Sequence, residues 1–178
     1  MTGVGPTLDP GSTLDDVRDE SGNRRGQRAR RVAMAALTGS VALGLVGFFG
    51  VRTSTVSASR GGYELTVEYP RVARAGLDAS WRVTVRHEGG FDGPITIATS
   101  ADYFDIFEHQ AFYPGPSEET ADADRLVLTF AEPAGDTFSL TFDAYVQPAS
   151  QRGRTATTAL VAGDRDVVSV RYRTWLAP

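Results

Sequence analysis

The chain has 178 residues, a formal net charge of -4 at pH 7 and no cysteine. The absence of cysteine excludes disulfides, thiolate metal sites and a cysteine nucleophile. The charge is unevenly placed, since the part from Thr53 onward holds 11 Arg against 17 acidic residues, a balance of -6. Nucleic-acid-binding domains normally present a basic face, so nucleic acid is not an expected partner of this acidic part.

Residues 1–31 are rich in Gly, Ser, Asp, Arg and Pro, and they contain no aromatic residue. A segment with so little apolar surface cannot offset the entropy lost on ordering. We therefore predict a disordered cytoplasmic tail over 1–31. It ends in the segment RRGQRARR at 24–31, which holds five Arg.

Residues 32–51 form an uncharged run of 20 residues, VAMAALTGSVALGLVGFFGV. A helix of that length spans about 30 Å, which is the thickness of a bilayer core. A buried core helix is the alternative, but soluble helices usually keep a polar face. The run predicts one transmembrane helix in the lipid bilayer of the cell membrane. The Arg cluster before it predicts a cytoplasmic N-terminus and an extracytoplasmic C-terminal domain.

A cleaved signal peptide is a further alternative for this run. Val56-Ser57-Ala58 offers small residues to a signal peptidase, and Arg30-Arg31 faintly resembles a twin-arginine signal. The run is longer than the usual 7–15 residues of a signal peptide, so we expect an uncleaved signal anchor.

Three small residues, Ala36, Ser40 and Gly44, recur every fourth position in the predicted helix. Such spacing lets two membrane helices approach closely, so a homodimer through this helix-packing face is one interpretation. The alternative is that Gly and Ala are simply common in membrane helices.

Residues 52–62, RTSTVSASRGG, are dominated by Ser, Thr and Gly and are predicted to be a flexible tether. The folded domain is expected over 63–178.

The domain shows apolar residues at every second position, which is typical of strands buried on one face. Trp81 is the expected central core residue. The pattern predicts an all-β fold, an immunoglobulin-like antiparallel β-sandwich of about seven strands. The seven segments lie within 63–69, 80–86, 95–97, 125–130, 137–147, 155–161 and 168–176.

Residues 100–124 interrupt this pattern with a dense group of aromatic residues. In one interpretation these rings close one end of the sandwich. In the other they form an exposed interaction surface for a partner. The candidate surface residues are Tyr103, Phe104, Phe107, Phe112 and Tyr113, together with Trp175 near the C-terminus.

Catalytic and metal-binding motifs are not found in the sequence. His87 and His109 do not have the spacing of zinc ligands, and the acidic residues within 102–108 and 118–124 match no EF-hand loop. We therefore expect no metal, no cofactor and no enzymatic activity.

The stretches RAGLDASWRVTV, GGFDGPI and SVRYRT, at 74–85, 89–95 and 169–174, resemble a group of uncharacterised single-pass membrane proteins of actinobacteria. The resemblance covers about 63–178. It implies an extracytoplasmic domain after one N-terminal helix, and it implies no catalytic residue.

Two functions remain open from the sequence. The first is a non-enzymatic interaction module, an accessory subunit that contacts another membrane or envelope protein. The second is a cell-surface domain that binds a small ligand or a glycan, with Trp175 as the residue that stacks on a sugar.

Overall fold

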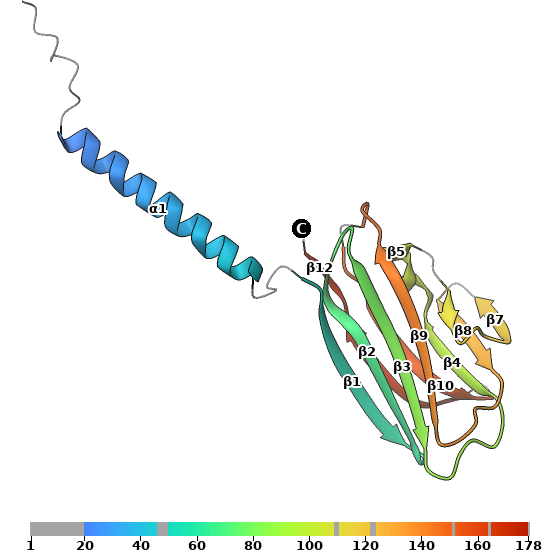
Figure 1. Ribbon diagram of the computed structural model, residues 1–178. Helices are drawn as coiled ribbons and strands as arrows, with labels where there is room; N and C mark the ends of the chain where they lie inside the picture. The colour runs from blue at the N-terminus through green and yellow to red at the C-terminus, as the bar shows by residue number, and fades with distance from the viewer. Residues whose placement is uncertain are drawn as a thin grey trace, which may run out of the picture. The chain divides into compact units, whose positions relative to one another are not determined.

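The computed structural model describes residues 20–45, 50–108, 111–121, 124–150, 152–163 and 165–177, without the side chains of 20–23. The chain divides into two compact units, Met1–Phe49 and Gly50–Pro178, and each is described by itself. The first contains the helix α1 and the second contains all of the strands (Figure 1).

Helix α1 spans Glu20–Leu45, so its bounds differ from the prediction at both ends. Residues 20–31 were expected to be disordered, but they are helical. Arg, Gln, Glu and Ala, which make up most of this segment, have high intrinsic helix propensities. Gly50 and Val51 are not helical, and residues 1–19 and 46–49 of the predicted tail and span lie outside the described residues. Within the described part of the chain, no helix combines the length and the apolar character needed to cross a membrane.

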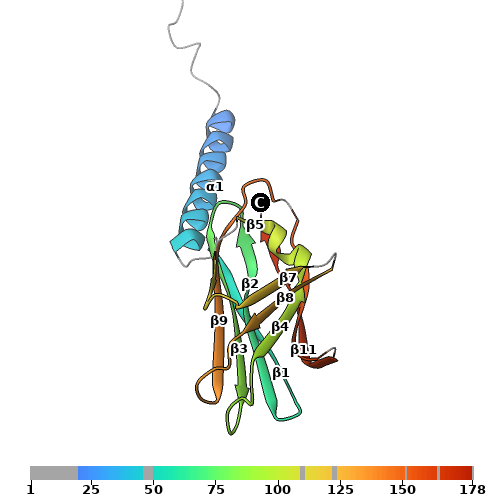
Figure 2. The same cartoon turned by 90° about the vertical axis from the view of Figure 1, so that its right-hand side faces the viewer.

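The strand-containing unit is an antiparallel β-sandwich, and Figure 2 shows its two sheets as separate layers. Five strands of the first sheet follow the order β1-β2-β3-β9-β5, while β6 also pairs with β9 and β12 with β2. Their bounds are Arg52–Arg60 (β1), Tyr63–Arg74 (β2), Asp78–His87 (β3), Thr137–Val146 (β9), Phe107–Glu108 (β5), Phe112–Tyr113 (β6) and Trp175–Ala177 (β12).

The second sheet has the order β11-β10-β4-β8-β7. All of its pairings are antiparallel. Its strands span Arg165–Arg173 (β11), Thr155–Ala162 (β10), Ile95–Ser100 (β4), Arg125–Phe130 (β8) and Glu118–Ala121 (β7). The prediction of an all-β sandwich is confirmed, and each of the seven predicted segments contributes a strand.

The predicted tether is instead strand β1, which pairs with β2 along its whole length. Gly61 and Gly62 form the turn with φ values of 63° and 83°, the positive values that a two-residue hairpin of this hand requires. Val56 and Ala58 then pack against the core. The Ser- and Thr-rich composition concealed the strand, although β-branched residues and a Gly-Gly pair are themselves typical of a hairpin.

The C-terminal segment is divided between the two sheets. Strand β11 ends at Arg173, and β12 leaves the second sheet to pair in parallel with β2. Thr174 lies at the crossing and is fully buried, and its backbone N–H donates to the carbonyl of Arg154.

The core lies between the two sheets, with Trp81 at its centre as predicted and fully buried. Its indole ring packs edge-on against Phe104, with 5.4 Å between ring centroids. Hydroxyl groups cross the core in a buried hydrogen-bonded group that includes Thr99, Thr158 and Tyr172. No buried side-chain nitrogen or oxygen among the described residues lacks a hydrogen-bond partner.

Candidate functional site

One end of the sandwich is closed by a short 3-10 helix, η1, which spans Ala101–Ile106 and connects β4 of the second sheet to β5 of the first. Tyr103, Phe104 and Ile106 of this helix are buried. On its outer side, the guanidinium of Arg154 lies 3.6 Å from Asp102 and 3.7 Å from Asp105. Both carboxylates are largely exposed, so this pairing orients the helix and adds little stability.

Beyond η1 the chain forms β6, and it then crosses to the second sheet as β7. The crossing contains a cis peptide bond between Tyr113 and Pro114. It is attached to β8 by Ser117, whose backbone N–H and hydroxyl both donate to the carbonyl of Thr129. The connection therefore runs from one sheet to the other at the side of the sandwich where β9 and β8 lie.

Three phenylalanine rings from three elements meet beside this connection. Phe104 of η1, Phe112 of β6 and Phe142 of β9 have centroid separations of 5.6, 5.1 and 5.0 Å. The two pairs that include Phe104 meet edge to face, a favourable arrangement for aromatic rings. Phe104 also contacts Trp81, so the trio continues directly into the core.

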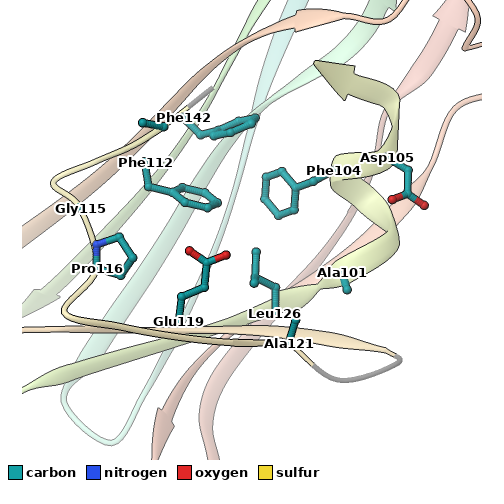
Figure 3. Close-up of a pocket in the computed structure, with 11 residues that line it drawn as sticks. Ala101, Phe104, Asp105, Phe112, Gly115, Pro116, Glu119, Ala121, Leu126 and Phe142 are labelled. Atoms are coloured by element: carbon teal, nitrogen blue, oxygen red, sulfur yellow. The ribbon is translucent and has the colours of Figure 1, made fainter. Parts of the chain in front are cut away.

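The trio forms one wall of a pocket of about 410 Å³ (Figure 3). The opposite wall comes from the β6–β7 connection, β7 and β8. The remaining lining residues are Ala101, Asp105, Ala111, Gly115, Pro116, Glu119, Ala121 and Leu126. A volume of this size is in the range of ligand-binding pockets, which are commonly apolar with a few polar groups.

Glu119 is the polar group that points into this pocket. Figure 3 shows its carboxylate between Phe112 and Leu126, whereas the carboxylate of Asp105 points outward, away from the rings. Glu119 lies on β7 opposite Leu128 of β8, and it is exposed to solvent. It forms no ion pair with any residue that the structure describes.

The residues of the predicted aromatic surface differ in burial. Tyr103, Phe104 and Phe107 are buried, so they close the end of the sandwich and cannot form an exposed surface. Phe112 is half-buried and contributes to the pocket wall, while Tyr113 is 81% exposed. The exposed-surface interpretation was wrong for these three residues, and the interpretation that the rings close the end of the sandwich fits them. Tyr103 and Phe104 on η1 and Phe107 on β5 all join the core.

Trp175 lies on β12 and does not line the pocket. The residue is 52% exposed, and the guanidinium carbon of Arg173 lies 3.6 Å from the centroid of its ring. One face of the indole is therefore already covered by a cation, an arrangement that stabilises both side chains.

Ala36, Ser40 and Gly44 are all exposed on α1. The hydroxyl of Ser40 donates to the carbonyl of Ala36, one turn earlier. Helix pairing through this face stays a prediction.

Metal-binding geometry is not found within the described residues, where no three His, Cys, Asp or Glu side chains come together. The ring nitrogen Nδ1 of His87 is hydrogen-bonded to the carbonyl of Gly90, and the ring stacks on Tyr63. His109 lies outside the described residues.

Two buried tyrosines, Tyr172 and Tyr103, have raised pKa values. Burial raises the pKa of Tyr172 to about 12, and burial followed by the nearby Tyr172 raises the pKa of Tyr103 well above its usual value. Both hydroxyls are held by threonines, Tyr172 by Thr158 and Tyr103 by Thr174. They are neutral structural groups at physiological pH.

Comparison with known proteins identifies no family. No family model matches the sequence, and no curated protein does. An alkylpurine DNA glycosylase AlkC of Pseudomonas fluorescens has a TM-score of 0.32 and 12% identity, over 60% of this chain and 28% of that one.

A β-glucosidase of Listeria innocua has a TM-score of 0.31 and 13% identity, over 70% of this chain and 16% of that one. A GH20 exo-β-N-acetylglucosaminidase of Vibrio harveyi has a TM-score of 0.29 and 12% identity, over 71% and 18%. The chain thus spans less than a third of the length of these proteins. Similarity this low implies no shared function.

Sequence reasoning missed the pocket-facing role of Glu119, Pro116 and Leu126. Nothing local distinguishes these residues, since they meet the phenylalanine trio only after the chain has crossed between sheets. The available signal was the pairing of an aromatic cluster with a following Pro- and Gly-containing segment, PGPSEET, at 114–120.

Proposed function

We propose that the unit Gly50–Pro178 is a non-enzymatic interaction module, and that the pocket beside Phe104, Phe112 and Phe142 binds a side chain of a partner protein. The observation that supports this most directly is the pocket itself, about 410 Å³ in volume and continuous with the core. Aromatic residues, phenylalanine included, are enriched in the buried cores of protein interfaces.

The composition of the pocket favours binding over catalysis. Its lining residues include two carboxylates and no histidine, serine, threonine, tyrosine or lysine. The two carboxylates point in different directions (Figure 3), and catalysis by a carboxylate pair needs both groups on one bound substrate. A binding pocket requires only the apolar walls and one orienting group.

The strand order supports an immunoglobulin-like assignment of the module. If β2, β3, β4, β9, β10 and β11 are taken as strands A, B, C, E, F and G, one sheet contains the pairs A-B and B-E. The other sheet contains the pairs C-F and F-G. In this assignment β5 to β8 form an elaboration between the third and fifth strands. The pocket lies in that elaboration.

We infer that the module acts outside the cell as part of a single-pass membrane protein. The support is the uncharged run at 32–51 and the Arg-rich segment before it. Protease added to intact cells is expected to remove the module from the full-length protein. Resistance in intact cells, with digestion after lysis, would contradict this orientation.

A photo-cross-linking side chain at Ala121 tests the interaction. Ala121 lies on β7 and lines the pocket, while Thr120 is the adjacent residue on the opposite face of the same exposed strand. We expect one partner protein to be captured from Ala121 in cells and not from Thr120. Capture that is equal from both positions would indicate random contact.

Blocking the pocket provides the second half of the test. Ala121→Trp fills the space in front of the rings, and Thr120→Trp adds the same bulk to the other face. Once the partner is identified by cross-linking, we expect it to copurify with the unsubstituted chain and with Thr120→Trp but not with Ala121→Trp, at unchanged stability. A partner that still binds to Ala121→Trp would show that the pocket is not the interaction site.

A small ligand is the second candidate, and the pocket volume favours it, since it lies within the range of about 300–1,000 Å³ typical of such sites. In that case purification of the full chain from its native membrane would retain a small molecule. Ala121→Trp would release it.

A further inference from the structure

Strand β7 is the last strand of the second sheet. It pairs with β8 on one side, and no described strand pairs with it on the other. All four of its residues are exposed. An edge strand of this kind presents unpaired backbone N–H and carbonyl groups, to which another chain can add a strand.

The opposite edge of this sheet is arranged differently. Val167 of β11 packs against the core. Its Cγ1 methyl would lie 3.7 Å from a Cβ atom placed on Gly61, in the β1–β2 turn. Strand β1 of the facing sheet therefore lies alongside that edge. The edge at β7 is the one that borders the pocket.

Two adjacent carboxylates occupy this edge, Glu118 and Glu119, and neither is paired with a cation among the described residues. Charges on an edge strand normally repel indiscriminate pairing. Two carboxylates repel an acidic strand and lose hydration against a neutral one, but they attract a strand that carries positive charge.

From these features we propose that β7 accepts an extended, basic segment of the partner protein as an additional antiparallel or parallel strand, and that one Arg or Lys of that segment enters the pocket to meet Glu119. The proposal rests on the proposed function and specifies the chemistry of the partner. In this mode backbone hydrogen bonds provide affinity, and pockets for alternate side chains provide specificity.

The pocket fits a cationic side chain for two separate reasons. The carboxylate of Glu119 points into it, and a cation over an aromatic face is attracted by the ring, most strongly where water is displaced. The apolar wall formed by Leu126 and Pro116 suits the methylene stem that Arg and Lys both carry.

Two arginines of the second unit, Arg154 and Arg125, are engaged with other carboxylates. Arg154 contacts Asp102 and Asp105 on the outer side of η1. Arg125, on β8, donates a hydrogen bond of 2.8 Å to Asp166. Neither arginine forms an ion pair with Glu119, so its carboxylate is open to a cation that a partner supplies.

Short fluorescent peptides test the charge. The probe alternates threonine and valine around a central arginine, and the control has citrulline, a neutral isostere, at the centre. With the purified full chain, we expect the arginine peptide to bind about tenfold more tightly, the equivalent of about 1.4 kcal/mol. Equal affinities for the two peptides would overturn the proposed charge recognition.

The matched protein variants are Glu119→Gln and Glu118→Gln, which remove one charge each from adjacent positions on opposite faces of β7. We expect Glu119→Gln to reduce arginine-peptide affinity about tenfold and to leave citrulline-peptide affinity unchanged. Equal losses in the two variants would show diffuse attraction without a cation in the pocket, and would overturn the proposal.

Backbone pairing is tested by N-methylation of alternate peptide nitrogens. Alternate N–H groups of an added strand point to opposite edges, and only one edge faces β7. Methylation of the set that faces β7 should abolish binding, and methylation of the other set should be tolerated. Equal tolerance in both registers would overturn strand addition. Binding of free butylguanidinium as tight as that of the peptide would identify a small-molecule pocket instead.

Failure of this inference is distinguishable from failure of the proposed function. If Ala121→Trp abolishes copurification of the partner while Glu119→Gln does not affect it, the pocket is an interaction site for an uncharged group. If neither variant affects copurification, the interaction itself lies elsewhere.

Discussion

Trp81 of the first sheet donates its indole N–H to the hydroxyl of Tyr172 of the second sheet, over 2.7 Å, in the middle of the core. The same hydroxyl is hydrogen-bonded to Thr158 at 2.9 Å. In a chain without cysteine, this hydrogen bond links the two layers where a disulfide cannot. Polar groups thus specify how the sheets align.

Removing the hydroxyl is the first prediction. Tyr172→Phe leaves the Trp81 N–H buried without an acceptor, and such a group costs about 1–3 kcal/mol. We expect the free energy of unfolding in urea to fall by that amount. Tyr113→Phe, at an exposed position, is the control and should change little.

Alkaline pH should destabilise the module through the same residue. Burial raises the pKa of Tyr172 to about 12 in the fold, against about 10 for an unfolded tyrosine. Since the folded value is the higher one, the stabilisation is complete below pH ~10 and is lost as pH rises toward ~12. Urea unfolding at a series of pH values should show a decline that begins near pH ~10.

Tyr103 contributes to this decline in the same direction, because burial raises its pKa as well. Tyr172→Phe should therefore make the decline shallower without removing it. A variant with the same pH dependence as the unsubstituted chain would contradict the assignment to Tyr172.

Deleting β1 tests the boundary of the module. A module that starts at Tyr63 lacks the strand that covers one edge of β2, and it exposes the core residues that contact Val56 and Ala58. Full burial of a Val side chain contributes about 1.5–3 kcal/mol, and Val56 and Ala58 are each partly buried. With the loss of the β1–β2 backbone pairing included, we expect a module that starts at Gly50 to be more stable in urea by an amount on the order of 2 kcal/mol. Equal stabilities would restore the tether interpretation of 52–62.

The backbone packs closely around Gly153, so a side chain at this position should destabilise the module. A Cβ at this position would overlap the carbonyl oxygen of Thr174 and lie 2.9 Å from the Cα of Trp175, both of them backbone atoms. Gly153→Ala must therefore displace the crossing from β11 to β12, and we expect a loss of several kcal/mol in urea unfolding. Gly115→Ala, with open space around it, is the matched control.

Alternating apolar residues allowed the sandwich to be predicted, because β2, β3, β9 and β11 each bury one face of an ordinary pleated strand. Strands β1 and β7 were not predicted from this pattern. The segment EETA of β7 has no apolar face to repeat, and it is a strand only because β8 offers it a partner. Strand formation at an edge is decided by neighbours that are distant in the sequence.

The candidate site was predictable in composition but not in geometry. Two of the aromatic residues that the sequence singled out, Phe104 and Phe112, line the pocket, yet the sequence does not indicate which rings turn inward. Phe104 enters the core because η1 directs it between the sheets, whereas Tyr113 on the two-residue strand β6 is exposed. Glu119 becomes part of the site only through the crossing from β6 to β7.

The pairing around Val72 has a consequence for how this module can be joined to other chains. Arg52 of β1 and Trp175 of β12 are both in register with Val72 of β2. Two strand spacings separate them, about 10 Å. Entry to the module and exit from it are therefore neighbours, and a linker of a few residues would join them. Circular permutation, with new ends at the Gly89-Gly90 turn, should therefore preserve the sandwich, and the module can be inserted into a loop of a host protein without forcing that loop apart.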